Sequence, residues 1–115
     1  MTMTNPSRGE IWLADLDPTR GHEQTGRRPV LMVSEDLFNR GPAELVIILP
    51  LTSVHRGVPS HVPISPPEGG LKTGSVILCE AIRSIARERL VKKWGSVSPS
   101  TMAAVEDRIR ILLGL

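Results

Sequence analysis

The sequence is poor in cysteine and in aromatic residues. Cys79 is the one cysteine among 115 residues, which excludes an internal disulfide framework and a cysteine-rich zinc site. It ends the apolar run at residues 76–79, where a small buried hydrophobic side chain is a better interpretation than a nucleophile. Tyrosine is absent, and Trp12, Phe38 and Trp94 are too few aromatic residues for a large base-stacking platform.

Long apolar runs are also missing. None reaches the ~20 residues of a membrane-spanning helix, and residues 1–7 lack the apolar centre of a secretory signal, so we expect a cytoplasmic protein. With 115 residues, of which 40% are hydrophobic, the chain suffices for one domain that buries roughly 65% of its unfolded surface. We therefore predict a single domain over residues 1–115, with a flexible terminus at residues 1–7.

The net charge of +2 is too small to indicate nucleic-acid binding by itself, but the charges are unevenly distributed. Residues 80–115 carry seven basic and four acidic side chains, whereas residues 1–79 carry seven basic and eight acidic ones. Two sets of cations would form one basic face if the fold brings them together: Arg27 with Arg28, and Arg83, Arg87, Arg89, Lys92 and Lys93. Otherwise they are ordinary solvated surface charges.

Short apolar segments alternate with polar loops along most of the chain. They predict strands at residues 10–16, 29–34, 45–52, 61–64, 75–82 and 90–97. Pro63 favours an edge position for the fourth of these strands. We expect short helical turns at residues 35–41, capped by Ser34 and stopped by Gly41, and near residues 85–88.

One long helix is predicted at the end of the chain. Ser98 and Pro99 are typical of an N-cap and a first helical turn. An apolar stripe follows at helical spacing and is best interpreted as a seal on the core: Met102, Val105, Ile109 and Leu112. Five or more short strands with one C-terminal helix predict a mainly-β (α+β) fold, a small and partly open barrel.

The polar segment at residues 17–29 connects the first two predicted strands. It has no periodicity, is dense in Arg, His, Glu, Gln and Thr, and is longer than a hairpin needs. Rigid strands on both sides would hold its hydrogen-bonding side chains in place, as in many binding and catalytic sites. The loop therefore indicates a site for an anionic ligand.

Two residues at the ends of predicted strands have side chains suited to phosphate chemistry. Arg28 precedes the second strand and Thr52 ends the third, so they would face one groove if the two strands are neighbours. A guanidinium supplies a fixed positive fork for a phosphodiester, and a threonine hydroxyl can donate to a phosphoryl oxygen or orient an attacking hydroxyl. Without further information, an arginine before a strand is more often a surface charge.

The sequence strongly resembles the MazF/PemK (Kid) family of toxin ribonucleases over nearly its whole length. The segments that carry the resemblance are RGEIW (8–12), DPTRGHEQTGRRP (17–29), PLTS (50–53), GSVIL (74–78) and IRSI (82–85). The pattern G-x-E-Q-x-G-x-R-P within the second segment is the specific part. The resemblance implies an SH3-like, partly open barrel of five to seven strands with a C-terminal helix, usually as a homodimer.

The resemblance also implies a reaction. The family cleaves single-stranded RNA at short sequences without a metal or other cofactor, through attack of the ribose 2′-hydroxyl that leaves 2′,3′-cyclic phosphate and 5′-hydroxyl ends. The family's catalytic arginine and threonine correspond to Arg28 and Thr52. A guanidinium is a poor proton donor at ordinary pH, so we favour charge stabilisation as the main role of Arg28.

We expect the RNA contacts to come from the polar loops and from the segment after residue 79. The candidates are Arg20, His22, Glu23, Gln24, Arg27, Ser53, His55, Glu80 and Arg83, of which Glu23 and Gln24 match the family's loop positions. For Glu80, an ion pair with Arg83 or Arg28 is as good an interpretation as a contact with RNA. Where the family often has glutamine, this chain has Ala81, which cannot make the same hydrogen bonds, so the recognised RNA sequence is in doubt.

Three alternatives stay open. A pair of histidines can act as base and acid in a ribonuclease, but nothing in the spacing of His22, His55 and His61 demands that they converge. A gyrase-poisoning toxin like the related CcdB proteins would lack the long loop pattern that is intact here. A catalytically silent RNA- or antitoxin-binding module is the third. Arg20 and Lys72 are candidates for phosphate contacts, although surface charges are the simpler interpretation.

The family also implies an antitoxin as a protein partner. Its acidic, partly disordered segment would lie across the toxin dimer and block the groove. The two sets of cations described above would give such a segment its charge complement, and disordered chains can wrap large surfaces.

Overall fold

The computed structural model describes residues 5–16 and 26–115 of the chain. Its strands are β1 (Glu10–Asp15), β2 (Arg27–Met32), β3 (Leu45–Thr52), β4 (His61–Ile64), β5 (Ser75–Leu78), β6 (Arg83–Ala86) and β7 (Leu90–Ser96). The α-helices are α1 (Asp36–Asn39) and α2 (Pro99–Leu113), and the short 3₁₀ turns are η1 (Glu68–Gly70), η2 (Cys79–Ala81) and η3 (Arg87–Arg89).

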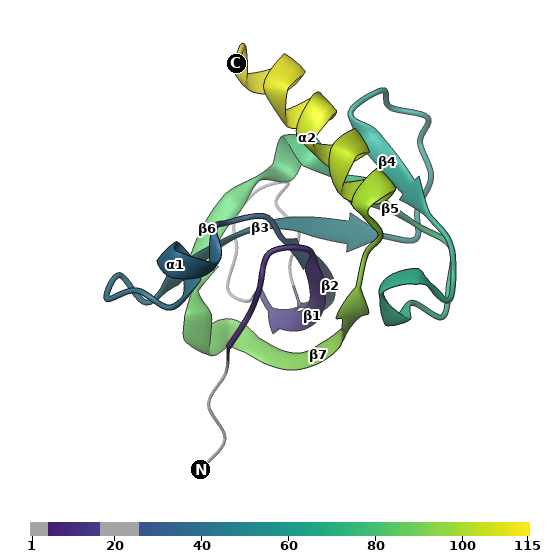
Figure 1. Cartoon of the computed structure of the whole chain (residues 1–115). Coiled ribbons are helices and arrows are strands. Elements are labelled where there is room, and N and C mark those ends of the chain that lie inside the picture. The colour runs from purple at the N-terminus through teal and green to yellow at the C-terminus, as the bar shows by residue number, and fades with distance from the viewer. Residues whose placement is uncertain (1–4, 17–25) are drawn as a thin grey trace.

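In the described part of the chain, the seven strands form one antiparallel sheet that coils around itself without closing. The strand order is β4-β5-β3-β2-β1-β7, and β6 also pairs with β3. Figure 1 shows β7 curving past β1, with α2 above the β4–β5 end of the sheet. The predicted partly open barrel with a C-terminal helix is confirmed, and β4, which contains Pro63, lies at an edge as expected.

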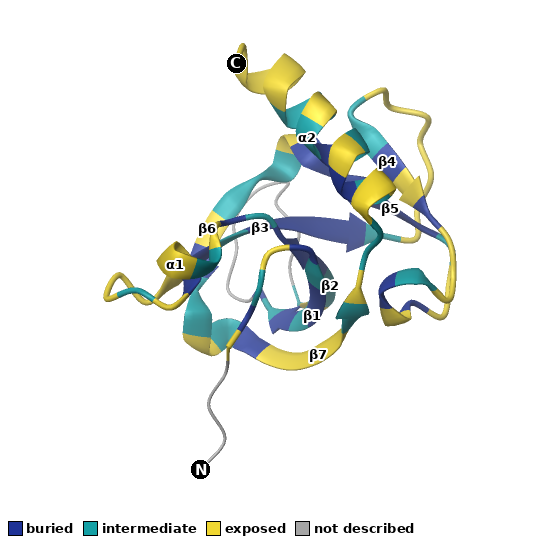
Figure 2. Cartoon of the chain, in the orientation of Figure 1, coloured by how far each residue is buried: buried dark blue, intermediate teal, exposed yellow. Residues whose placement is uncertain are grey.

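The central strands are buried on both faces, which explains their nearly continuous apolar sequences. Ile11, Leu31 and Leu49 point to one face, where they pack with Met102 and Val105 of α2. On the opposite face a second cluster collects the alternate residues: Trp12, Ala14, Leu16, Val30, Met32, Val46, Ile48, Ile85 and Leu90. In Figure 2 the buried colour runs through β3 and the inner part of α2, while the C-terminal end of the helix is exposed.

The predicted strand at residues 75–82 is wrong, because the strand ends at Leu78 and a new one begins at Arg83. Both strands run along the same edge of β3, but their registers differ. Leu51 pairs with Ile77 in β5, whereas Ile48 pairs with Arg83 in β6, three residues beyond the position that an unbroken register would give. The 3₁₀ turn η2 takes up these residues, and an apolar run does not reveal such a shift.

The helix ends agree only in part with the sequence. In α2, the Ser98 hydroxyl accepts a hydrogen bond from the Thr101 N–H at 3.2 Å, as an N-cap should. In α1 the N-cap position belongs to Glu35, so the prediction of a Ser34 cap is wrong. The Ser34 hydroxyl instead accepts from the Ile47 N–H at 2.9 Å and donates to the Asn39 side chain, which ties α1 to β3.

Two boundaries near the polar loop matter for function. β2 begins at Arg27, two residues before the predicted start, because Arg27 and Arg28 pair with Asp15 and Ala14 of β1. Both arginines are therefore held on a strand rather than on the loop. Within the described residues, no helix is both long enough and apolar enough to cross a membrane.

Candidate active site

A groove of about 750 Å³ opens beside the ends of β2 and β3. Every ionisable side chain among the described residues that line it is a cation: Arg27, Arg28, Lys72, Lys92 and Lys93. Hydroxyl groups come from Thr52, Ser53, Thr73 and Ser75, and apolar surface comes from Pro29, Leu51, Leu71 and Trp94. This combination suits an anionic ligand that also presents flat or apolar surface.

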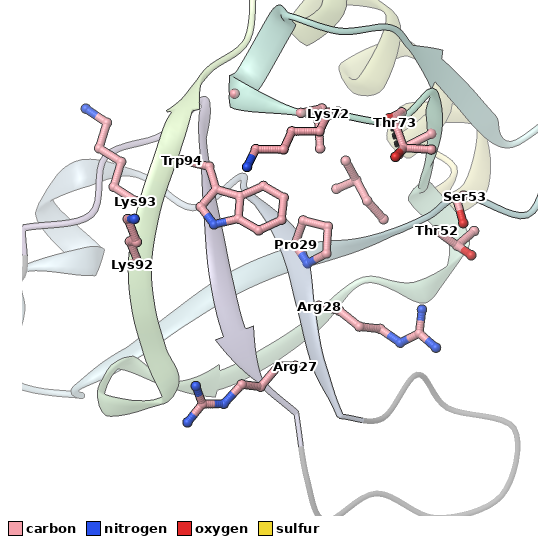
Figure 3. Close-up of a pocket in the computed structure, with 14 residues that line it drawn as sticks. Arg27, Arg28, Pro29, Thr52, Ser53, Lys72, Thr73, Lys92, Lys93 and Trp94 are labelled. Atoms are coloured by element: carbon pink, nitrogen blue, oxygen red, sulfur yellow. Dashed lines mark hydrogen bonds between the residues drawn. The ribbon is translucent and has the colours of Figure 1, made fainter.

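Arg28 and Thr52 reach the groove from neighbouring strands, as the sequence predicts if those strands pair. Val30 pairs with Pro50, and Arg28 and Thr52 each lie two residues beyond this pair, on the face of the sheet to which Val30 and Pro50 point. The pairing of β2 with β3 ends at Val30 and Pro50, so the two side chains lie where the strands separate. In Figure 3 the Arg28 side chain extends on the Thr52 side of the groove, whereas Arg27 points the opposite way.

The Thr52 hydroxyl is oriented by the backbone that follows β3. Its oxygen accepts a hydrogen bond from the Val54 N–H at 3.2 Å, which closes a turn over the end of the strand. The oxygen is thereby held on the backbone side, so its proton is directed away from that N–H. Thr52 is half-buried and Ser53 is exposed, so the next hydroxyl along the chain is more open to solvent.

The opposite wall of the groove belongs to β7. Lys93 pairs with Glu10 at 2.9 Å between Nζ and Oε2. Burial raises the pKa of Glu10, but hydrogen bonds from Lys93, the Trp12 indole and the Ser7 N–H outweigh it and lower the pKa below its usual value. Glu10 therefore stays ionised and fixes Lys93 at the rim. Lys92 is exposed beside it.

The predicted basic face forms only in part. Arg27, Arg28, Lys92 and Lys93 share the groove, and Lys72 joins them from the loop after η1. Arg87 instead donates from Nη1 to the Asn39 carbonyl oxygen at 2.7 Å, and Arg89 donates to the Asp15 carbonyl oxygen at 3.1 Å. These two arginines brace backbone segments, and neither lines the groove.

The remaining predicted RNA contacts are divided. Ser53 lines the groove, whereas His55 does not, and its Nε2 lies 3.5 Å from the carbonyl oxygen of Gly74. Arg83 lies on β6 opposite Ile48, and the groove lining does not include it. Four predicted contacts fall outside the described residues: Arg20, His22, Glu23 and Gln24.

Glu80 also lies outside the groove, in a separate cluster of polar side chains. Its carboxylate accepts from the Ser60 hydroxyl and from His61 Nε2, each at 2.7 Å. Burial raises the pKa of Glu80, but these hydrogen bonds outweigh it and lower the pKa below its usual value. Neither His61 nor His55 lines the groove, so the two described histidines do not form a base–acid pair there.

Cys79 is a buried thiol, as expected. Burial, with a smaller contribution from the charge of Glu80, raises its pKa to about 11. Because the thiolate is the nucleophilic form, this environment makes the side chain inert. Among residues 5–16 and 26–115, no group of three or more His, Cys, Asp or Glu side chains is placed to hold a metal ion.

The sequence did not mark Trp94 or Thr73 as site residues, yet both line the groove. The position of Trp94 depends on an irregular pairing of β7 with β1, which no periodic pattern contains. The Trp94–Gly95 pair, with the Gly69–Gly70 turn elsewhere in the chain, was the available signal for a close backbone approach.

Comparisons with known proteins identify the family of the chain. Residues 7–113 match the family of PemK-like, MazF-like toxins of type II toxin–antitoxin systems. Endoribonuclease MazF9 of Mycobacterium tuberculosis is 37% identical over 113 residues, which cover 94% of this chain and 96% of that protein.

Solved structures give the same result. The crystal structure of MazF from Deinococcus radiodurans superposes with a TM-score of 0.87 at 30% identity, over 98% of this chain and 100% of the other. A mycobacterial endoribonuclease in complex with its cognate antitoxin superposes with a TM-score of 0.77 at 29% identity, over 98% and 97% of the two chains. The chain therefore belongs to the MazF/PemK family of toxin endoribonucleases of type II toxin–antitoxin systems.

Proposed function

We propose that this chain is a metal-independent, sequence-specific endoribonuclease that cleaves single-stranded RNA with Arg28 and Thr52 at its centre. The observation that carries the proposal is that these two side chains, from the neighbouring strands β2 and β3, line one groove whose described ionisable residues are all cations. A groove of this kind attracts a polyanion, and here it combines a guanidinium with a half-buried hydroxyl.

The reaction uses a nucleophile that RNA itself supplies. The 2′-hydroxyl oxygen attacks the adjacent phosphorus and loses its proton, while the bond from phosphorus to the 5′-oxygen breaks and that oxygen gains a proton. The products are a 2′,3′-cyclic phosphate and a 5′-hydroxyl end. No metal-bound water is needed for this route, so metal independence is a prediction of the mechanism.

Arg28 and Thr52 serve different needs of this reaction. The phosphorane transition state carries more negative charge than the phosphodiester, and a guanidinium keeps its proton and offers a planar fork of donors. We therefore assign Arg28 to charge stabilisation, which is strongest where donors are fixed before the reaction. Thr52, whose oxygen already accepts from Val54 N–H, is assigned to donate its proton to a phosphoryl oxygen and to position the scissile phosphate.

The biological role follows from this activity and from the family. Cleavage of messenger RNA in the cytoplasm would inhibit translation and growth, and a cognate antitoxin would neutralise the enzyme. The mycobacterial relative in complex with its antitoxin supports such a partner. An acidic, disordered antitoxin segment would complement the cations of the groove and compete with RNA for it.

We also propose that the active form is a homodimer. The end of α2 and the residue after its C-cap support this, because Ile111 is 71% exposed, Leu113 55% and Leu115 83%. Beside it lies a pocket of about 170 Å³ with an apolar lining of Cys79, Ile82, Ile109, Leu112 and Leu113, together with Glu80. A second copy of the chain would cover this apolar surface.

The proposal is tested by cleavage of a long RNA of known sequence, with the cleavage ends mapped. Arg28→Ala should reduce kcat by about 10²- to 10³-fold, the usual effect of losing one fixed donor to a developing negative charge. Thr52→Val should also reduce kcat strongly, whereas Arg40→Ala, an exposed arginine outside the groove, should not. Undiminished cleavage by the Arg28 or Thr52 variant would refute the assignment.

Two controls separate the alternatives. Cleavage should persist in excess EDTA, and a loss that only a divalent metal restores would contradict the mechanism. RNA that is bound but not cut by the unaltered protein would indicate a silent binding module. Inhibition of gyrase supercoiling without RNA cleavage would indicate a CcdB-like toxin.

A further inference from the structure

Trp94 owes its position to a β-bulge in β7. Lys93 pairs with Trp12 of β1, and Gly95 pairs with Ile11, so Trp94 is an extra residue between two consecutive pairs. A bulge breaks the alternation of side chains along a strand and redirects the extra residue, and bulges are frequent beside active sites. Here the redirected indole becomes part of the groove lining.

The backbone that carries Trp94 is fixed by close contact with the turn at η1. A Cβ atom on Gly70 would lie 2.1 Å from the Trp94 carbonyl oxygen, and one on Gly95 would lie 2.7 Å from the Gly69 carbonyl carbon. These gaps admit only glycine, so two backbone segments pack directly against each other. The backbone of the bulge is therefore held in place by η1, and this fixes where the Trp94 side chain leaves the strand.

The surroundings of the indole suit a nucleobase with its phosphates. Trp94 is 36% exposed, whereas Trp12, the other indole, is 9% exposed and lies in the core. In the view of Figure 3 the Lys72 side chain extends towards the indole, and Pro29 lies between the indole and Arg28. Lys72 and Lys92 both line the same groove, so an aromatic face is combined with two cations.

We propose that Trp94 is a base-stacking residue of the RNA site, which holds one unpaired base of the substrate while Lys72 and Lys92 contact the flanking phosphates. The inference rests on the proposed ribonuclease function and adds a binding position to it. An exposed aromatic face among cations is how single-stranded nucleic acid is held, because every base has a face to stack and every linkage carries a charge. Since no described carboxylate lines the groove, we favour RNA over a basic peptide as the occupant.

The first test compares Trp94→Ala with Trp94→Phe in RNA cleavage. Stacking of one base is worth about 5- to 150-fold in affinity, so Trp94→Ala should raise KM by a factor in that range and leave kcat within a few-fold of its original value. Trp94→Phe keeps an aromatic face and should restore most of the lost affinity. A KM that is unchanged in Trp94→Ala would overturn the inference.

A second test does not depend on the stability of a Trp94 variant. Oligonucleotides that span the mapped cleavage site are made with one base at a time removed, so that the ribose and phosphate remain. Removal of the base at one position should weaken binding of the oligonucleotide to the unaltered protein. Removal of the same base should cause no further loss of affinity in Trp94→Ala. Equal losses at that position in both proteins would show that the base contacts something else.

A third test observes the indole directly. In a Trp12→Phe protein, Trp94 is the sole tryptophan, and its emission should be quenched saturably by the oligonucleotide with a 2′-deoxy ribose at the cleavage site. Binding is measured in parallel from the anisotropy of a labelled oligonucleotide. Binding without any change in Trp94 emission would overturn the inference alone, and so would quenching by oligoglutamate but not by RNA. Failure of the unaltered protein to cut or bind RNA would refute the proposed function itself.

Discussion

Replacing Gly70 with alanine tests whether the contact between η1 and β7 is as tight as the geometry requires. Two separate costs arise at this position. Its φ of +73° lies in the left-handed region, where a residue with a Cβ atom costs roughly 1–2 kcal/mol. In addition, the new Cβ would lie 2.1 Å from the Trp94 carbonyl oxygen, so one of the two backbones has to move.

Two other glycines separate these costs. Gly57 has a φ of +65° and nothing within 4 Å of its added Cβ, so Gly57→Ala carries only the conformational cost. Gly95 has no positive φ, but its added Cβ would lie 2.7 Å from the Gly69 carbonyl carbon, so Gly95→Ala carries only the overlap. In all three variants alanine also lowers the conformational entropy of the unfolded chain, which raises the free energy of unfolding by about 0.4–1 kcal/mol. This contribution is the same in each variant and cancels when the variants are compared.

The expected order of destabilisation follows from these terms. Gly57→Ala should lower the free energy of unfolding by about 0.5–1 kcal/mol after the unfolded-state gain. Overlap in a packed site costs typically about 1–3 kcal/mol, and contact with backbone rather than a flexible side chain favours the upper end. Gly70→Ala should therefore be less stable than Gly57→Ala by about 3 kcal/mol, with Gly95→Ala in between.

The measurement is urea unfolding monitored by circular dichroism. The m-values, which give the dependence of the free energy of unfolding on urea concentration, must agree before the midpoints are compared. If Gly70→Ala and Gly57→Ala differ by less than about 0.5 kcal/mol, the scale of ordinary surface substitutions, the two backbones are not in close contact. That result would also remove the rigid support inferred for Trp94. A loss of stability in Gly70→Ala together with a raised KM for RNA would show that the backbone contact also supports the RNA-binding position of Trp94.

Two further predictions concern titratable groups away from the groove. Burial raises the pKa of Glu68, but hydrogen bonds from the Ser98 N–H and the Thr101 hydroxyl outweigh it and lower the pKa. Its stabilising effect is therefore complete above the unfolded-state pKa and is lost as the pH falls through the lower folded-state pKa, so the stability difference from Glu68→Gln should shrink in acid; a difference that is constant with pH would contradict this. For Cys79, burial and the raised pKa of about 11 predict that a thiol reagent labels the folded protein at neutral pH far more slowly than the urea-unfolded protein. Rapid labelling of the folded protein would contradict the burial of the thiol.

Local patterns in the sequence were sufficient for most of the secondary structure. Residues 45–52 and 61–64 were predicted with the bounds that the structure has, because apolar runs between turn residues mark such strands. The α2 helix begins as predicted because its N-cap is local: the Ser98 hydroxyl accepts a hydrogen bond from the N–H of Thr101, three residues later. The family, and with it the expectation of Arg28 and Thr52 as a pair, also follows from a loop pattern that can be read along the chain.

The register of strand pairing could not be predicted from the sequence, and this register decides which side chains lie next to one another. The three-residue shift between β5 and β6 ended a strand that the apolar pattern continued to residue 82. Which arginines share the groove was likewise decided by pairing, since Arg87 and Arg89 look like Arg27 and Arg28 in the sequence but donate to backbone carbonyl oxygens. Glu80 accepts hydrogen bonds from Ser60 and His61, which lie about twenty residues earlier in the chain, and no local pattern predicts this contact.

By itself, then, the sequence determined most of the strands, the C-terminal helix and the chemical inventory, because these depend on periodicity, caps and residue types that are local; the break between β5 and β6 is the exception. Only the tertiary structure decided that Arg28 and Thr52 line one groove and that a bulge brings Trp94 into the same groove. The physical reason is that pairing register and backbone contact join segments far apart in the chain. A shift of one residue in the pairing register would turn the same side chains to the other face of the sheet.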